Sequence, residues 1–311
     1  MRDAPFVTIP NITLLDDALE DWPALKKEHE WDGLLLGNGA SIAVSQKFSY
    51  ASLLGYAQLS PEAHNVFATL DTTNFELVLD ALRVSARVCE SVGHGPDDAE
   101  DLHDEVRKSL FGAVNDVHPE HHEVSGARLK AFADCMLQYS VTFTTNYDLL
   151  PYWAIMEGLV GVKDYFWNAD CTFDALDTEL WGGSAILYLH GGMHLYQDAV
   201  TGVTGKWKGL RLLDVAATRH RTRSPLVVSE DKLRSIRRSD FLSFAYRELA
   251  EFSQPLVIFG HGLGQSDQHI IGPSTRTRTG RSRMASARLR DWMSSEESSS
   301  STRSYESRRA S

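Results

Sequence analysis

Four short runs along the chain share one pattern, in which a buried-strand signature breaks into glycine, asparagine or histidine. Three runs are apolar before the break, and the second is rich in threonine. Such runs are typical of parallel strands whose carboxyl ends open into a ligand crevice. The pattern therefore predicts an α/β fold with a parallel sheet. The runs are LLLGNGAS (residues 34–41), TFTTNYD (142–148), LYLHGG (187–192) and LVIFGHGLGQSD (256–267).

Between the first two runs the pattern changes to helical periodicity. Apolar residues recur every three or four positions through residues 72–90, where Thr73 and Glu76 have the spacing of a capping box. Further helical segments are expected around 102–110 and 126–138. Together they predict a helical insertion over about residues 60–140, placed to cover the crevice.

The pattern also divides the chain into three parts. A lead-in helix is expected within residues 1–31, and the sheet domain spans 32–270. Residues 271–311 hold 12 serines and nine arginines among 41 residues, a composition that cannot bury enough surface to fold. We expect a disordered tail there. Its abrupt onset suggests an out-of-frame extension, and a basic tail that binds RNA is the alternative.

Composition and charge narrow the function classes. The net charge of −11 combines +5 in residues 271–311 with −16 in the other 270 residues, so nucleic acid is not expected as a partner. No apolar run is long enough to cross a membrane, and the N-terminus does not resemble a secretion signal. Three widely spaced cysteines form no zinc module. The expectation is a cytoplasmic protein without a metal site.

The first run supplies candidate phosphate-binding residues. Gly37, Asn38 and Gly39 follow a strand directly, and glycines there let backbone amides approach a pyrophosphate, with Ser41 close behind. The run matches neither the G-x-G-x-x-G fingerprint nor a Walker loop, and an ordinary tight turn is equally compatible with it.

The second and third runs supply an amide, a carboxylate and an imidazole. Asn146 and Asp148 alternate, so in an extended segment both side chains project to the same side and suit a polar ligand. The alternative is a turn in which Asp148 caps the next helix. His190 follows a strand and is either a core residue or a base near neutral pH.

The remaining candidates are weaker. Gly260 and Gly262 allow close backbone approach after the fourth run, and Asp267 could bind a ribose or cap a helix. The histidines at 118, 121 and 122 are expected in a solvated loop, and the basic run KLRSIRR (232–238) on a solvated helix face.

Taken together, GNGAS, TTNYD, LHG and GHGLG resemble, in order, the Gly-Ala-Gly loop, the Thr-Gln-Asn-Ile-Asp motif, the Leu-His-Gly and the Gly-Thr-Ser loop of sirtuin-like (SIR2) domains. FSYASLL and RRSDFLSFAYREL resemble the uncharacterised bacterial DUF4917 branch. The resemblance covers about residues 30–270 and implies a Rossmann-like fold that binds NAD or a related nucleotide. The implied roles are pyrophosphate binding by Gly37, Gly39 and Ser41, ribose and nucleophile positioning by Asn146, carboxamide binding by Asp148, general base catalysis by His190, and contact with adenosine by Gly260 and Gly262.

Departures from the SIR2 pattern change the expected activity. The four-cysteine zinc module and the Pro-Asp-Phe-Arg segment of deacylating sirtuins are absent from the sequence, which argues against protein deacylation. SIR2-like domains without these parts are commonly NAD hydrolases, including effectors of bacterial anti-phage defence. The resemblance therefore implies an NAD glycohydrolase with NAD as substrate and no metal, compatible with a homo-oligomer. A non-catalytic NAD or ADP-ribose sensor and an ADP-ribosyltransferase remain as alternatives.

Overall fold

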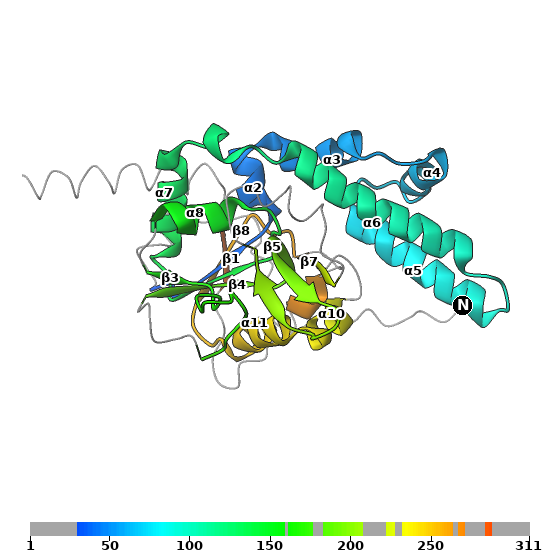
Figure 1. Ribbon diagram of the computed structural model, residues 1–311. Coiled ribbons are helices and arrows are strands. Elements are labelled where there is room, and N and C mark those ends of the chain that lie inside the picture. The colour runs from blue at the N-terminus through cyan, green and yellow to red at the C-terminus, as the bar shows by residue number, and fades with distance from the viewer. Residues whose placement is uncertain are drawn as a thin grey trace, which may run out of the picture. The chain divides into compact units, whose positions relative to one another are not determined.

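Six parallel strands form the central sheet of the computed structural model (Figure 1). Their order is β3-β4-β2-β1-β8-β9, and without the two-residue edge strand β3 the remaining five follow the Rossmann order. The structure describes residues 30–158, 161–176, 183–207, 222–227, 232–263, 267–270 and 284–287. The strands are β1 (Gly33–Leu36), β2 (Val141–Thr144), β3 (Val162–Lys163), β4 (Ser184–Tyr188), β8 (Leu256–Phe259) and β9 (Met284–Ala287).

The apolar runs form the centre of this sheet, as predicted. All residues of β1 and β8 are buried, and Leu34 pairs with Thr142 on one side and Val257 on the other. The threonines of β2 are also fully buried, so the threonine-rich run is as much a core strand as its apolar neighbours. Because all strands run the same way, the ends of the four runs meet at one edge of the sheet.

Helices cover both faces of the sheet (Figure 1). The helices α7 (Gly126–Met136) and α8 (Leu150–Gly158) lie on one face, and α11 (Asp240–Glu251) lies on the other. The apolar residues of α11 form a stripe typical of an amphipathic helix, and its inward residues, such as Phe241 and Leu242, are completely buried. The architecture is therefore the expected α/β arrangement.

The predicted helical insertion is present between β1 and β2. It contains a pair of long helices, α5 and α6, which contact each other along their length. One detail of the prediction is wrong: Asn74, not Thr73, caps α5 by accepting a hydrogen bond from the backbone of Glu76, whose side chain is used elsewhere. The elements are α2 (Asn38–Val44), η1 (Gln46–Phe48), α3 (Tyr50–Tyr56), α4 (Pro61–Thr69), α5 (Phe75–Ser91), α6 (Asp97–Val117) and η2 (His121–Glu123).

A second, antiparallel sheet follows directly after His190. It consists of β5 (Gly191–Asp198) flanked by β6 (Thr204–Lys206) and β7 (Arg223–Val227). Gly191 allows this change of direction, because its φ of 77° is left-handed and a Cβ would lie 1.9 Å from the carbonyl oxygen of Leu226. The turn fixes the backbone on which His190 sits.

Both ends of the chain lie largely outside the described residues. The predicted lead-in helix falls before residue 30, where the described part of the chain begins. The predicted tail, 271–311, also lies outside them, apart from β9, which pairs in parallel with β8. The sheet thus extends beyond the domain boundary expected at residue 270. Within the described part of the chain, no helix is long and apolar enough to cross a membrane.

The buried His194 on β5 makes the stability of the protein depend on pH. Its ring is fully buried between Tyr152 and Tyr188, and neither ring nitrogen has a hydrogen-bond partner among the described residues. Burial lowers the pKa of His194 well below its ordinary value, and the Lys206 ammonium lowers it further. The unfolded chain therefore binds a proton that the folded protein does not, and stability falls as the pH drops below about 6.5.

We expect His194→Phe to raise the unfolding free energy by about 1 kcal/mol at pH 7, because it removes a buried polar group without a partner. The gain should grow toward pH 5, because His194 of the wild type is then protonated only in the unfolded chain, which lowers the wild type's unfolding free energy. Urea unfolding between pH 5 and 8 measures both effects. The exposed His122→Gln is the matched control and should leave the unfolding free energy at pH 7 unchanged; a destabilised phenylalanine variant would contradict the explanation.

Candidate functional site

A cavity of about 380 Å³ lies where β1, β2, β4 and β8 end, within the size range of small-molecule sites. It adjoins the switch point between β1 and β8, where the strand order reverses and Rossmann-like folds bind ligands. The helical insertion completes its wall, as predicted. The lining residues are Asn38, Gly39, Ile42, Phe48, Tyr50, Leu53, Asn74, Glu76, Val114, Thr145, Asn146, Tyr147, Asp148, His190, Gly260, His261, Gly262 and Asp267.

The glycines after β1 pack directly against the backbone after β8. A Cβ on Gly37 would lie 2.6 Å from the carbonyl oxygen of Gly260, and one on Gly39 would lie 2.6 Å from the Cα of Gly260. Their amides also donate to β8 and its loop, Gly37 to Phe259 (2.9 Å) and Gly39 to Gly260 (2.8 Å). Close backbone packing thus explains why glycine stands at positions 37 and 39. It also places the loop after β1 beside the loop after β8 at the cavity.

Asn146 and Asp148 project to the same side, as their alternation predicts, and both bind Ser41. The Ser41 hydroxyl donates to Asp148 Oδ2 (2.5 Å) and accepts from Asn146 Nδ2 (2.8 Å). Asn146 Nδ2 also donates to the carbonyl of Gly37 (3.0 Å), and Asp148 Oδ1 accepts from the amide of Leu150 at the start of α8. Oδ1 of Asp148 therefore caps the start of α8, as the turn alternative predicts, while Oδ2 binds Ser41.

This network determines which atom of Asn146 can meet a ligand. An amide has two hydrogens to donate, and both are used, by Gly37 and Ser41. Its Oδ1 is then the atom that can accept a hydrogen bond from a ligand in the cavity. Ser41, by contrast, does not line the cavity and acts by orienting the other two side chains.

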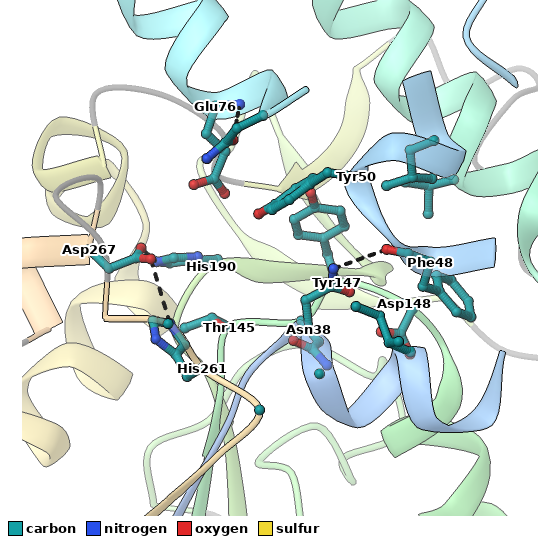
Figure 2. A pocket seen from close by; sticks show the side chains of 18 residues that line it. Asn38, Phe48, Tyr50, Glu76, Thr145, Tyr147, Asp148, His190, His261 and Asp267 are labelled. Atoms are coloured by element: carbon teal, nitrogen blue, oxygen red, sulfur yellow. Dashed lines mark hydrogen bonds and ion pairs between the residues drawn. The ribbon is translucent and has the colours of Figure 1, made fainter. Parts of the chain in front are cut away.

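His190 is buried at the cavity edge among other charged and polar groups (Figure 2). Its Nε2 lies 2.9 Å from Nε2 of His269 and 3.8 Å from Oδ1 of Asp267. Burial lowers the pKa of His190 well below its usual range, and Lys232 lowers it further. The imidazole is therefore neutral at neutral pH.

Lys232 connects three parts of the chain that are distant in sequence. Its Nζ donates to Asp267 Oδ1 (2.6 Å), beside the β8 loop, and to Glu76 Oε2 (3.0 Å) on α5. The lysine is buried, with 8% of its surface exposed, so the prediction of a solvated basic face on α10 (Lys232–Arg238) is wrong at this residue. The ion pairs explain how a lysine is tolerated there.

Tyr50 and His118 complete the wall and its support. Burial raises the pKa of Tyr50 above its ordinary value, with Glu76 and Asp267 adding to the rise, so its hydroxyl stays protonated. His118 is buried rather than in the solvated loop expected from sequence, and its Nε2 accepts from the amide of Leu149 (2.9 Å). It thereby anchors the chain just after Asp148.

Most of the predicted site residues meet at the cavity. Gly37 and Ser41 lie behind it, and the other seven line it: Asn38, Gly39, Asn146, Asp148, His190, Gly260 and Gly262. Sequence reasoning missed the roles of Tyr50, Glu76, Lys232 and His269. Tyr50, Glu76 and Lys232 lay in segments that were noted for other reasons, His269 did not, and Asp267 had been limited to ribose binding or capping.

The family of the chain follows from a match to the sequence model described as "Domain of unknown function (DUF4917)", over residues 34–287. The chain belongs to the DUF4917 family. The match confirms the predicted family and, like β9, extends beyond residue 270.

The solved structures to which this DUF4917 protein is similar include two sirtuin structures. A Sir2 homologue mutant in complex with ADP-ribose is 14% identical over 86% of this chain and 84% of that chain, with a TM-score of 0.37. A structure titled "The Structural basis for Sirtuin Substrate affinity" is 13% identical over 81% of each chain, with a TM-score of 0.32. No curated protein matches the chain.

The backbone contact at Gly39 leads to a matched pair of substitutions. Gly39→Ala places a methyl group 2.6 Å from a backbone carbon that cannot rotate away, so we expect the unfolding free energy to fall by about 2 kcal/mol. Gly112→Ala, on an exposed turn of α6 with open space around the added Cβ, should instead raise it by about 0.5–1 kcal/mol. Chemical denaturation measures both, and equal effects would contradict the packing role of Gly39.

Proposed function

We propose that this protein is an NAD glycohydrolase, which splits NAD into nicotinamide and ADP-ribose in the cavity described above. The observation that carries the proposal is that Asn146 and His190, 44 positions apart, line the same cavity at the carboxyl edge of the sheet. The order of the four motifs, with its resemblance to SIR2 domains, supports NAD as the ligand. The cavity must then suit both the charge of NAD and the reaction.

The charge of the cavity suits the nicotinamide half of NAD. Glu76, Asp148 and Asp267 line it, and none of the described lining residues is a lysine or arginine. Carboxylates stabilise the pyridinium of the substrate and then the positive charge that develops on the ribose as the glycosidic bond breaks. Tyr50 and Phe48 add aromatic side chains, which also favour a cation.

The polar atoms suit attack by water. Asn146 Oδ1 accepts a hydrogen bond from a ribose hydroxyl or from the attacking water, since the amide hydrogens of this residue are already donated. The oxygen of water bonds to C1′ while the bond to the pyridinium nitrogen breaks. Nicotinamide leaves as a neutral molecule and needs no general acid. His190 takes the proton that water releases.

The glycine-rich loops suit the remainder of the dinucleotide, with one change to the expected contacts. The amides of Gly37 and Gly39 donate inside the protein, so they do not serve a pyrophosphate. We infer that the pyrophosphate lies against the side-chain-free surface of Gly39 and Gly260, away from the carboxylates. Gly262 then borders the adenosine side.

Nicotinamide release by the purified protein tests the proposal. We expect His190→Ala and Asn146→Ala each to lower kcat by about 100-fold or more, because each removes a group that contacts the reacting atoms. His122→Ala, at an exposed histidine, is the matched control and should retain full activity. Thermal unfolding of each variant establishes that it is folded.

Other outcomes separate the alternative functions. Release unchanged in both alanine variants would remove the assigned catalytic residues. Thermal stabilisation by NAD without product would instead indicate a sensor module, because a ligand that binds only the folded state stabilises it. Transfer of labelled ADP-ribose to a macromolecule would indicate a transferase.

A further inference from the structure

Three side chains at the edge of the cavity bring potential metal ligands together. Nε2 of His190, Nε2 of His269 and a carboxylate oxygen of Asp267 all lie within 4.8 Å of one another. Sequence spacing does not predict this cluster, because His190 and His269 are 79 positions apart. Two imidazoles and one carboxylate form a ligand set that Zn²⁺ and other transition metals accept.

The two imidazoles point their Nε2 atoms at each other. These atoms are 2.9 Å apart while the ring centroids are 5.0 Å apart, so the rings meet through their nitrogens rather than stack face to face. One proton must lie between them, since two bare lone pairs would repel. A metal ion can replace that proton. Tetrahedral zinc with bonds of 2.0–2.1 Å places its ligand atoms about 3.3 Å apart, so the two nitrogens must separate by a few tenths of an ångström and both rings must turn toward the ion.

The carboxylate lies at a compatible distance, with a competing cation beside it. Asp267 Oδ1 is 3.8 Å from His190 Nε2, slightly more than a tetrahedral separation, and it accepts from Lys232. Lys232 also has Glu76 as a partner, so it keeps an ion pair if Asp267 turns toward a metal. The lysine should therefore weaken metal binding without preventing it.

A third histidine nearby lies beside the carboxylate rather than among the proposed ligands. Nδ1 of His261 accepts a hydrogen bond from the amide of Leu263 (2.9 Å), so in the neutral ring the proton is on Nε2. That Nε2 faces Asp267 Oδ2 at 3.6 Å. His261 thus lies beside the carboxylate oxygen that Lys232 does not bind, in the place of an outer partner of a metal ligand.

We propose that His190, Asp267 and His269 bind one divalent transition-metal ion, of which Zn²⁺ is the representative. His190 and Asp267 line the cavity, so water within it completes the coordination. Binding itself does not depend on the proposed function. The effect on activity does depend on the proposed function. If the protein hydrolyses NAD, the bound ion occupies the Nε2 lone pair of His190 and repels the positive charge of the pyridinium. The ion therefore inhibits turnover.

Calorimetric titration of the untagged, full-length protein with Zn²⁺ tests the site without any substrate. We expect one ion per chain, bound with micromolar or tighter affinity, and a Co²⁺ complex with the absorption spectrum of a tetrahedral site. His269→Gln should weaken binding at least about 10-fold by removing a ligand. His122→Gln, at an exposed histidine, controls for binding to surface imidazoles and should have no effect.

Lys232→Met should change Zn²⁺ affinity in the opposite direction to His269→Gln. The variant keeps a long apolar stem but removes the competing charge between Glu76 and Asp267, so Zn²⁺ should bind about 10-fold more tightly. If this variant is unstable without metal, Zn²⁺ should raise its melting temperature more than that of the wild type.

The outcomes distinguish the metal site from the proposed reaction. Absence of stoichiometric binding to the wild type, or binding unchanged by His269→Gln, overturns the metal site whatever the protein does to NAD. Stoichiometric binding by a protein that releases no nicotinamide supports the metal site and counts against the hydrolase. Turnover that Zn²⁺ inhibits in the wild type, and inhibits less in His269→Gln, supports both.

Discussion

The site depends on one contact, in which the loop after β1 meets the loop after β8 with no side chain between them. Gly37 and Gly39 approach Gly260 so closely that a methyl group on either would collide with backbone. The carbonyl of Gly37 then receives Asn146, and the helix that begins at the next residue presents Ser41 to Asp148. A backbone contact therefore positions the amide and the carboxylate, and the phosphate-binding role expected of the glycines is not needed to explain them.

A buried ion-pair chain gives the other half of the site its position. Lys232 lies between Glu76 of the insertion and Asp267 beside the β8 loop, and Asp267 in turn lies close to His190. Breaking such a chain at one member leaves a buried charge without its partner, which costs far more than an exposed pair contributes. The insertion is thus tied electrostatically to the sheet at the cavity itself, and it contributes part of the cavity wall.

The parts of this arrangement that sequence could predict are local. The continuous apolar run of β1 predicts a strand that is buried on both faces, as the structure has it. The glycines that follow it predict a close approach of another group to the backbone. What sequence could not supply are contacts across long separations. Lys232 and Glu76 are 156 residues apart, and nothing in KLRSIRR distinguishes its one buried cation from its exposed ones. His118 shows the same limit, because a histidine in a polar segment became a buried acceptor only through packing against η1 and α8.

The balance of charge joins the two proposals. The cavity is lined by three carboxylates, and the ammonium group of Lys232 binds Asp267 without itself belonging to the lining. Such a site favours cations, whether the pyridinium of NAD or a metal ion at His190, and it disfavours the phosphates of a nucleotide. A dinucleotide can therefore bind productively only with its cationic end inward and its anionic part near the glycine loops. In the proposed reaction this orientation brings the glycosidic bond to Asn146 and His190, so the charge that selects the ligand also aligns it for attack.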